Sequence, residues 1–213
     1  MKLSGSPAER TTAATDVLLG LSAAGGILWL QWFQPAPSWR IQVWSWSFGL
    51  VALAASLGAI THGLILAPTL RRRLWGALTL ALGLAVSLFV VGVVHDLYGM
   101  EAARSFLPLM LLTGVGVFLI SRLWAGLFIV FIVFQGVALA AALAAYAQLA
   151  AAGALHGAGL MAAGVLVSMA AAGAQAARRL RLEFIWEFDH NGIFHLLQTA
   201  GLMLLCQGIS EGG

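Results

Sequence analysis

The residues best suited to chemistry crowd into one short stretch, EFDHNGIFHLLQ, at residues 187–198. This stretch combines carboxylates, imidazoles and side-chain amides in a chain that is only 9% charged. Its helical periodicity places four polar residues at positions i, i+4, i+8 and i+11, which share one face: Glu187, Asn191, His195 and Gln198. Such a stripe cannot face lipid, so we expect it to line the bundle interior or a wet cavity.

Three histidines could form a catalytic zinc site, which uses three protein ligands and leaves a fourth position for water. The candidates are His62, His190 and His195. Zinc would lower the pKa of the bound water towards 7 and polarise a carbonyl, as amide or ester hydrolysis requires. A carboxylate would then orient a histidine or act as the general base. The candidate carboxylates are Asp16, Glu187 and Asp189.

The same cluster permits roles without zinc. In a binding role, Asn191 and Gln198 would join His62 and His195 in hydrogen-bonding a lipid headgroup, a quinone or a pigment carbonyl. In a structural role, the cluster would be an inter-helix network in a small subunit of a larger membrane complex. Heme also stays open, because His62 and His195 alone do not distinguish it from zinc.

The elements that position these residues are membrane helices. The chain is 61% hydrophobic, and its 9% of charged residues compares with about 25% in globular domains. Several runs without a charged residue approach the roughly 20 residues that a helix needs to cross a bilayer. None of them alternates as a strand would, and a spanning segment must satisfy its own backbone hydrogen bonds, so helices are expected.

The sequence therefore predicts an all-α integral membrane protein, a seven-transmembrane-helix bundle that forms a single domain over residues 1–213. The predicted helices span about 13–34, 40–66, 74–97, 103–121, 124–149, 156–177 and 185–208. The polar end of the third helix, HDLYG at residues 95–99, is expected to be structural, because charged residues at span ends cost little.

Basic residues predict the orientation of this bundle. Of the 11 Lys and Arg residues, all but Arg40 and Arg104 fall on the side that holds the N-terminus. This asymmetry predicts a cytoplasmic N-terminus and a C-terminus outside, in a cell membrane such as the bacterial inner membrane. The arginine clusters are expected to contact anionic membrane lipids, and nucleic acid is not an expected partner.

The placement of the histidines resembles that of the CREST group of seven-helix membrane hydrolases, which includes the alkaline ceramidases and the progestin and adiponectin receptors. In that group, one histidine late in the second helix and two in the seventh, spaced H-x-x-x-H, hold zinc near the cytoplasmic side. ITHG supplies His62 and HNGIFHLLQ supplies His195 at the matching places. The resemblance implies a zinc-dependent lipid amidase or esterase.

Two positions in the second and seventh helices differ from the pattern of that group, and the aspartate that the group has in its third helix is absent here until Asp96, at the far end of that helix. Asn191 stands where the motif has its first histidine, and Gly58 stands where it has a serine. His190 is therefore the expected third ligand. Because His190 and His195 point roughly 140° apart on a regular helix, joint ligation requires a departure from helical geometry near Gly192.

Overall fold

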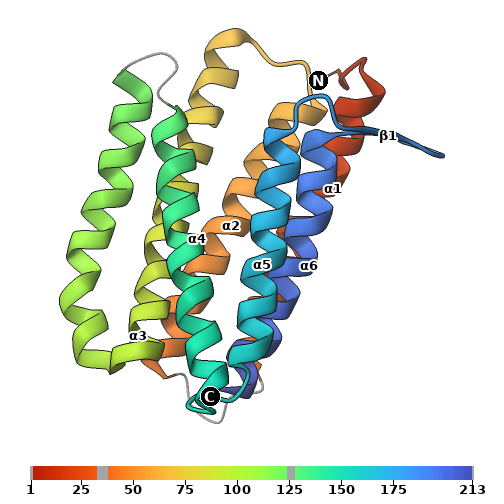
Figure 1. Cartoon of the computed structure of the whole chain (residues 1–213). Coiled ribbons are helices and arrows are strands. Elements are labelled where there is room, and N and C mark those ends of the chain that lie inside the picture. Colours follow the sequence, from red (N-terminus) through yellow and green to blue (C-terminus); the bar gives the residue numbers. More distant parts are fainter. Residues whose placement is uncertain (1, 33–37, 124–127, 213) are drawn as a thin grey trace.

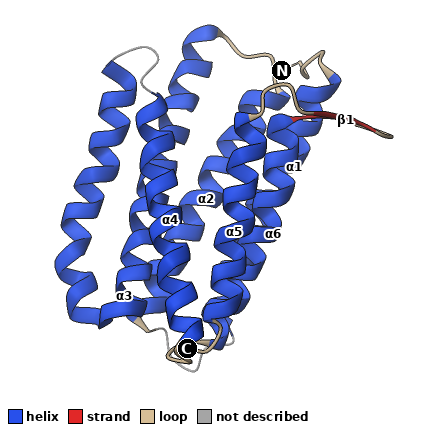
Figure 2. Cartoon of the chain, in the orientation of Figure 1, coloured by secondary structure: helices blue, strands red, loops and turns tan. Residues whose placement is uncertain are grey.

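The computed structural model describes residues 2–32, 38–123 and 128–212. Within these ranges the chain is almost entirely helical (Figure 2). The helices are α1 (Pro7–Trp32), α2 (Trp39–Gly63), α3 (Pro68–Leu123), α4 (Phe128–Ala151), α5 (Ala158–Ala176) and α6 (His190–Glu211). Between α5 and α6, strands β1 (Arg181–Glu183) and β2 (Glu187–Asp189) form an antiparallel hairpin.

All six of these helices are long and apolar enough to cross a membrane. Their long axes run side by side in one bundle, with the chain termini at opposite ends (Figure 1). The prediction of an all-α, multi-pass membrane protein is confirmed at this level. One end of the bundle, where α1 begins and α2 ends, is called the Asp16 end. The opposite end is called the Arg40 end.

Helix α3 is bent into two arms at Gly99. Its 56 residues would extend about 84 Å as a straight helix, far beyond a hydrocarbon core of about 30 Å. Gly99 has φ +83°, a left-handed conformation that glycine adopts without a Cβ penalty. The two arms then lie next to each other (Figure 1), and a Cβ on Gly83 would come within 2.9 Å of the Gly114 carbonyl oxygen. The predicted helices 74–97 and 103–121 fall on these two arms.

Close backbone contacts between glycines also join α5 to α6. A Cβ on Gly164 would lie 2.8 Å from the carbonyl oxygen of Gly201. Small residues at such contacts let membrane helices approach and gain van der Waals contact along their length. This packing fixes α6, and with it His195, against its neighbours.

The predicted helix over 185–208 is wrong at its beginning, because residues 187–189 belong to strand β2 and α6 starts at His190. The Asp189 carboxylate accepts hydrogen bonds from the backbone N–H groups of Asn191 and Gly192, which makes it the N-cap of α6. Glu187 therefore does not share a helical face with His195, and the predicted four-residue stripe begins only at Asn191.

Other boundaries differ by a few residues. Helices α1 and α3 begin at Pro7 and Pro68 rather than at 13 and 74. Proline suits these early helical positions, since its fixed φ matches the helix and its missing N–H would have no helical partner there. Helix α2 finishes at Gly63 rather than 66. The predicted end at 34 and the predicted start at 124 lie outside the described residues.

Candidate functional site

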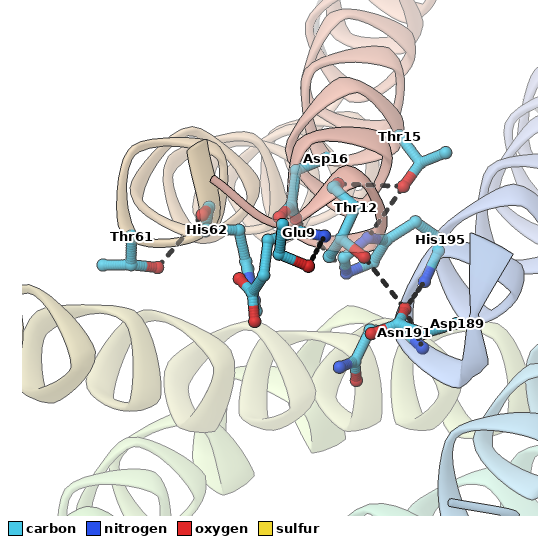
Figure 3. Close-up of polar contacts among 12 residues, drawn as sticks. Glu9, Thr12, Thr15, Asp16, Thr61, His62, Asp189, Asn191 and His195 are labelled. Atoms are coloured by element: carbon cyan, nitrogen blue, oxygen red, sulfur yellow. Dashed lines mark hydrogen bonds and ion pairs between the residues drawn. The ribbon is translucent and has the colours of Figure 1, made fainter. Parts of the chain in front are cut away.

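Polar side chains from three helices meet inside the Asp16 end of the bundle. Helix α1 supplies Asp16 and Thr15 from its third turn, α2 supplies His62 from its last turn, and α6 supplies His195 (Figure 3). Because α1 and α6 start at this end and α2 finishes here, residues far apart in the sequence reach the same depth.

Asp16 is buried, with 3% of its surface exposed, and its carboxylate fills the space next to Gly58. A Cβ at position 58 would lie 2.7 Å from both Asp16 oxygens. The carboxylate of α1 therefore occupies the space that a side chain at position 58 of α2 would fill. Glycine is required there by this close approach.

His195 joins Asp16 and Thr15 through its two ring nitrogens. Its Nε2 lies 3.2 Å from Asp16 Oδ1, and its Nδ1 lies 3.2 Å from Thr15 Oγ1. The Thr15 hydroxyl donates its single hydrogen to the Thr12 carbonyl oxygen at 2.9 Å, so towards His195 it acts as an acceptor. Nδ1 therefore carries a hydrogen, and Nε2 faces Asp16 Oδ1 across the 3.2 Å contact.

The second carboxylate oxygen, Asp16 Oδ2, is buried and has no hydrogen-bond partner. On an ionised carboxylate this oxygen can only accept hydrogen bonds. A buried acceptor without a donor costs about 1–3 kcal/mol. This oxygen is the least satisfied group of the site.

Asp16 and His195 form part of the wall of a cavity of about 200 Å³. Much of its remaining wall is apolar and includes Phe48, Phe89 and Leu139. Seven further polar residues also line it: Ser47, His62, Gln135, Ser168, Gln175, Asn191 and Gln198. Since a cavity of about 150 Å³ can hold a benzene molecule, this one has room for a small ring or a short alkyl chain.

His62 has a partner that the sequence reasoning missed. Its Nδ1 lies 2.7 Å from Glu9 Oε2, and its ring meets Trp75 edge to face, with centroids 5.5 Å apart. A signal for Glu9 was present in the sequence, because Glu9, Thr12 and Asp16 stand at i, i+3 and i+7 on α1 and share one face.

Asp189 holds the beginning of α6 in place. It accepts hydrogen bonds from Thr12 Oγ1 at 2.9 Å and from the backbone N–H groups of Asn191 and Gly192 at 3.0 and 2.9 Å. Partial burial alone would raise the pKa of Asp189, but the bonds from Gly192 and Thr12 outweigh it and lower the pKa below its usual value. Asp189 thus connects the start of α6 to α1. It lies next to the cavity but is not one of its lining residues.

The three histidines of the predicted zinc site do not all line the cavity. Within the described residues, no three His, Cys, Asp or Glu side chains are grouped as metal ligands. Helix α6 keeps helical geometry through Gly192, so His190 and His195 diverge, and His190 is not part of the cavity wall. Glu187 faces a separate groove beside the hairpin. Zinc binding therefore stays a prediction.

A second polar cluster lies at the Arg40 end. Arg40 Nε is 2.6 Å from Asp96 Oδ1, and its Nη1 donates to the Ile209 carbonyl oxygen at 2.8 Å. Tyr146 donates to Asp96 Oδ2 at 3.0 Å, and His95 Nδ1 lies 3.3 Å from Asp96 Oδ1. These contacts connect α2, α3, α4 and α6, and both Asp96 oxygens have partners.

Fold and site together define a multi-pass helical membrane protein with a mostly apolar internal cavity and a carboxylate–imidazole pair in its wall. The chain belongs to a family described as a family of unknown function (DUF6962), whose model matches residues 11–213. No curated protein and no solved structure matches it. The resemblance to the CREST hydrolases stays a prediction.

Proposed function

We propose that this protein binds a small amphiphile inside its helical bundle, with the polar head of the ligand at Asp16 and its apolar body in the cavity. The observation that carries the proposal is that Asp16, a residue of the cavity wall, has a buried oxygen, Oδ2, without a hydrogen-bond partner. Burying that oxygen costs free energy that a ligand with the right group would recover.

The head of the ligand is a hydrogen-bond donor: a hydroxyl, an amine or an amide N–H. Oδ2 of the ionised carboxylate has no partner and can only accept a hydrogen bond. A group that only accepts, such as the carbonyl of an oxidised quinone or of a pigment, would leave Oδ2 unsatisfied. Of the binding alternatives that the sequence leaves open, donor-bearing lipid-like molecules therefore fit this wall best.

The apolar body of the ligand lies among the aromatic and aliphatic side chains deeper in the bundle. Phe48, Phe89 and Leu139 supply contacts there, and each buried CH₂ of the ligand would contribute about 0.8 kcal/mol. Pockets of this composition, mostly apolar with a few convergent polar groups, are the usual form of small-molecule sites.

The two arms of α3 favour seven crossings rather than six, because each arm alone approaches the thickness of a bilayer core. With seven crossings, the distribution of basic residues puts the N-terminus and the Asp16 end on the cytoplasmic side of a cell membrane, the bacterial inner membrane being our proposal. The ligand would then enter from the lipid or from the cytoplasm.

Hydrolysis remains a weaker candidate. The Asp16–His195 pair has the residue types of a general base, but a third zinc ligand is missing from its surroundings among the described residues. An accessory role in a larger membrane complex is compatible with ligand binding and would add partner subunits to it.

The proposal can be tested with two ligands that differ by one hydrogen-bond donor, a medium-chain primary alcohol and its methyl ether. We expect the detergent-solubilised protein to bind the alcohol about tenfold more tightly, since a hydrogen bond to a charged group is worth about 1.5–3 kcal/mol. The preference should vanish in Asp16→Ala and persist in Glu183→Ala, which changes a hairpin residue away from the cavity. Binding would be measured as the ligand-dependent rise in Tm.

Two results would count against this function. Equal binding of the alcohol and the ether by the wild-type protein would show that Oδ2 does not select a donor. Equally, an organic extract of the purified protein, analysed by mass spectrometry, should contain a donor-bearing amphiphile that is depleted from Asp16→Ala. An extract in which the two proteins carry the same lipids would place the ligand elsewhere.

A further inference from the structure

The tip of the β-hairpin exposes three large apolar side chains in a row. Phe184, Ile185 and Trp186 have 93%, 87% and 67% of their surface exposed. Contiguous apolar groups of this size rarely face water in a stable protein and mark surfaces that meet a partner or a membrane.

The strands that carry this tip have one apolar and one charged face. Leu182 pairs with Phe188 across the hairpin, while Arg181 pairs with Asp189 and Glu183 with Glu187. Side chains alternate between faces along a strand, so Leu182 and Phe188 share one face and the charged residues share the other. An isolated two-stranded hairpin is marginal in water, and one with an apolar tip needs an apolar environment.

Arginines cluster where the hairpin leaves the bundle. Arg178, Arg179 and Arg181 are all exposed, and none of the three forms an ion pair within the described part of the chain. Three guanidinium groups beside an apolar tip complement a surface that is anionic outside and apolar beneath, as the headgroup layer of a phospholipid leaflet is.

The position of the hairpin fits such a surface. It projects sideways from the Asp16 end, away from the helix bundle, rather than extending along the helix axes (Figure 1). Helix α6, which is long and apolar enough to span a membrane, begins directly after β2 at His190. The hairpin therefore stands at the level where a membrane span starts, which is the interface between headgroups and acyl chains.

We propose that the β1–β2 hairpin is a membrane-interface anchor that inserts Phe184, Ile185 and Trp186 into an anionic phospholipid leaflet while Arg178, Arg179 and Arg181 contact its headgroups. Tryptophan is enriched at this depth of membranes because its ring is apolar and its N–H is polar. The anchor does not depend on what the cavity binds.

The hairpin is also connected to the cavity wall. Its last residue, Asp189, caps α6 and accepts a hydrogen bond from Thr12 of α1. His195 lies less than two turns further along α6. An anchored hairpin thus holds the start of the helix that carries His195 at a fixed depth in the leaflet.

The depth of the tip can be measured with a fluorescent label on Ile185→Cys in a Cys206→Ser background. Nanodiscs would contain phosphatidylcholine and phosphatidylglycerol, with bromine either high on the acyl chain or absent. We expect brominated lipid to quench the label at 185 severalfold more than a label on Ala152→Cys, in the exposed turn after α4. Aqueous iodide should show the opposite order.

The arginine contacts are tested in the same discs. Removing phosphatidylglycerol should weaken quenching of the Ile185 label by brominated lipid, and the combined variant Arg178→Gln, Arg179→Gln and Arg181→Gln should abolish that dependence. The proposal is overturned if iodide reaches the 185 label as easily as the 152 label. Protection of the 185 label from both quenchers would overturn it too, because the tip would then be docked on protein. Quenching that does not depend on phosphatidylglycerol would overturn the proposed contacts between the arginines and the headgroups.

Discussion

The two ends of the bundle each bury an aspartate, and the two aspartates have opposite surroundings. Asp96, at the Arg40 end, meets a guanidinium, a phenol and an imidazole, so that both of its oxygens have partners. Asp16, at the other end, lines a cavity and contacts His195 through one oxygen, while its second oxygen has no partner.

This difference separates a structural cluster from a candidate binding site. Buried polar networks that satisfy every member rigidify the fold around them. The Asp96 network does so by connecting four helices. A buried polar group without a hydrogen-bond partner does not rigidify the fold in this way. Such a group is explained when a ligand or a water molecule supplies the missing hydrogen bond. Burial and charge alone would have ranked the two aspartates equally, and the count of their partners distinguishes them.

The largest expected effect is that of Asp96→Asn. It would leave the buried Arg40 guanidinium, 6% exposed, without a charged partner. Removing one member of a buried ion pair typically costs about 3–5 kcal/mol. We expect a comparable loss in the free energy of unfolding, measured by titration with a denaturing detergent. Arg104→Ala, which removes an exposed guanidinium 5.7 Å from the ring of Trp39, serves as the control and should change stability little.

Gly58→Ser should have the next largest effect. The added Cβ would lie 2.7 Å from the Asp16 oxygens, so Asp16 or α2 must move, and overpacking of this kind costs about 1–3 kcal/mol. The same denaturation assay measures it. Gly173→Ser is the matched control, since a Cβ at that position meets nothing within 4 Å. If Gly58→Ser left the stability unchanged, the Asp16 carboxylate would be able to move away from position 58 at little cost.

Loss of the Asp189 cap should cost less. Asp189→Ala removes the acceptor for two N–H groups of α6 and for Thr12, and N-cap replacements typically cost about 1 kcal/mol. Because its pKa is lowered in the folded protein, the ionised carboxylate stabilises the fold above the ordinary value of about 3.9. That contribution is lost as the pH falls through the lower folded value.

The pH dependence gives this prediction its own control. The stability difference between the wild type and Asp189→Ala should be constant at neutral pH and shrink only below about pH 4. Thermal unfolding followed by circular dichroism at a series of pH values would show it. A difference that grows on acidification would contradict the assignment of Asp189 as an ionised cap.

Much of the architecture could be predicted because membrane insertion imposes simple rules. Long runs without charge, such as 74–97, must be helical inside lipid, and both arms of α3 were recognised from them. The hairpin was missed because residues 185–189 were assigned to the predicted helix 185–208 and residues 181–184 to the connection before it. Their alternation of charged and apolar residues, Arg181-Leu182-Glu183 and Glu187-Phe188-Asp189, has the two-residue period of strands.

The candidate site was predictable in part. Glu187, Asn191, His195 and Gln198 were expected to face one cavity together with His62. All of them except Glu187 line the same cavity, and Glu187 lines the groove beside the hairpin. The sequence could not predict which partner each polar group of the site contacts. The contact of Asp16 with Gly58, the Glu9–His62 pair and the partners of Asp96 depend on how helices distant in the chain pack, and no local spacing encodes those contacts.

The smallest expected effect on stability is that of Asp16→Asn, and it tests the comparison most directly. Asparagine keeps the shape of the side chain, and its amide N–H can donate to His195 Nε2 while its carbonyl oxygen faces the cavity as an acceptor. We expect a change within about 1 kcal/mol, against a loss several times larger for Asp96→Asn. Both variants would be unfolded in the same detergent titration. If Asp16→Asn proved as costly as Asp96→Asn, Asp16 would be the ionised half of a structural ion pair, and its open oxygen would no longer mark a ligand site.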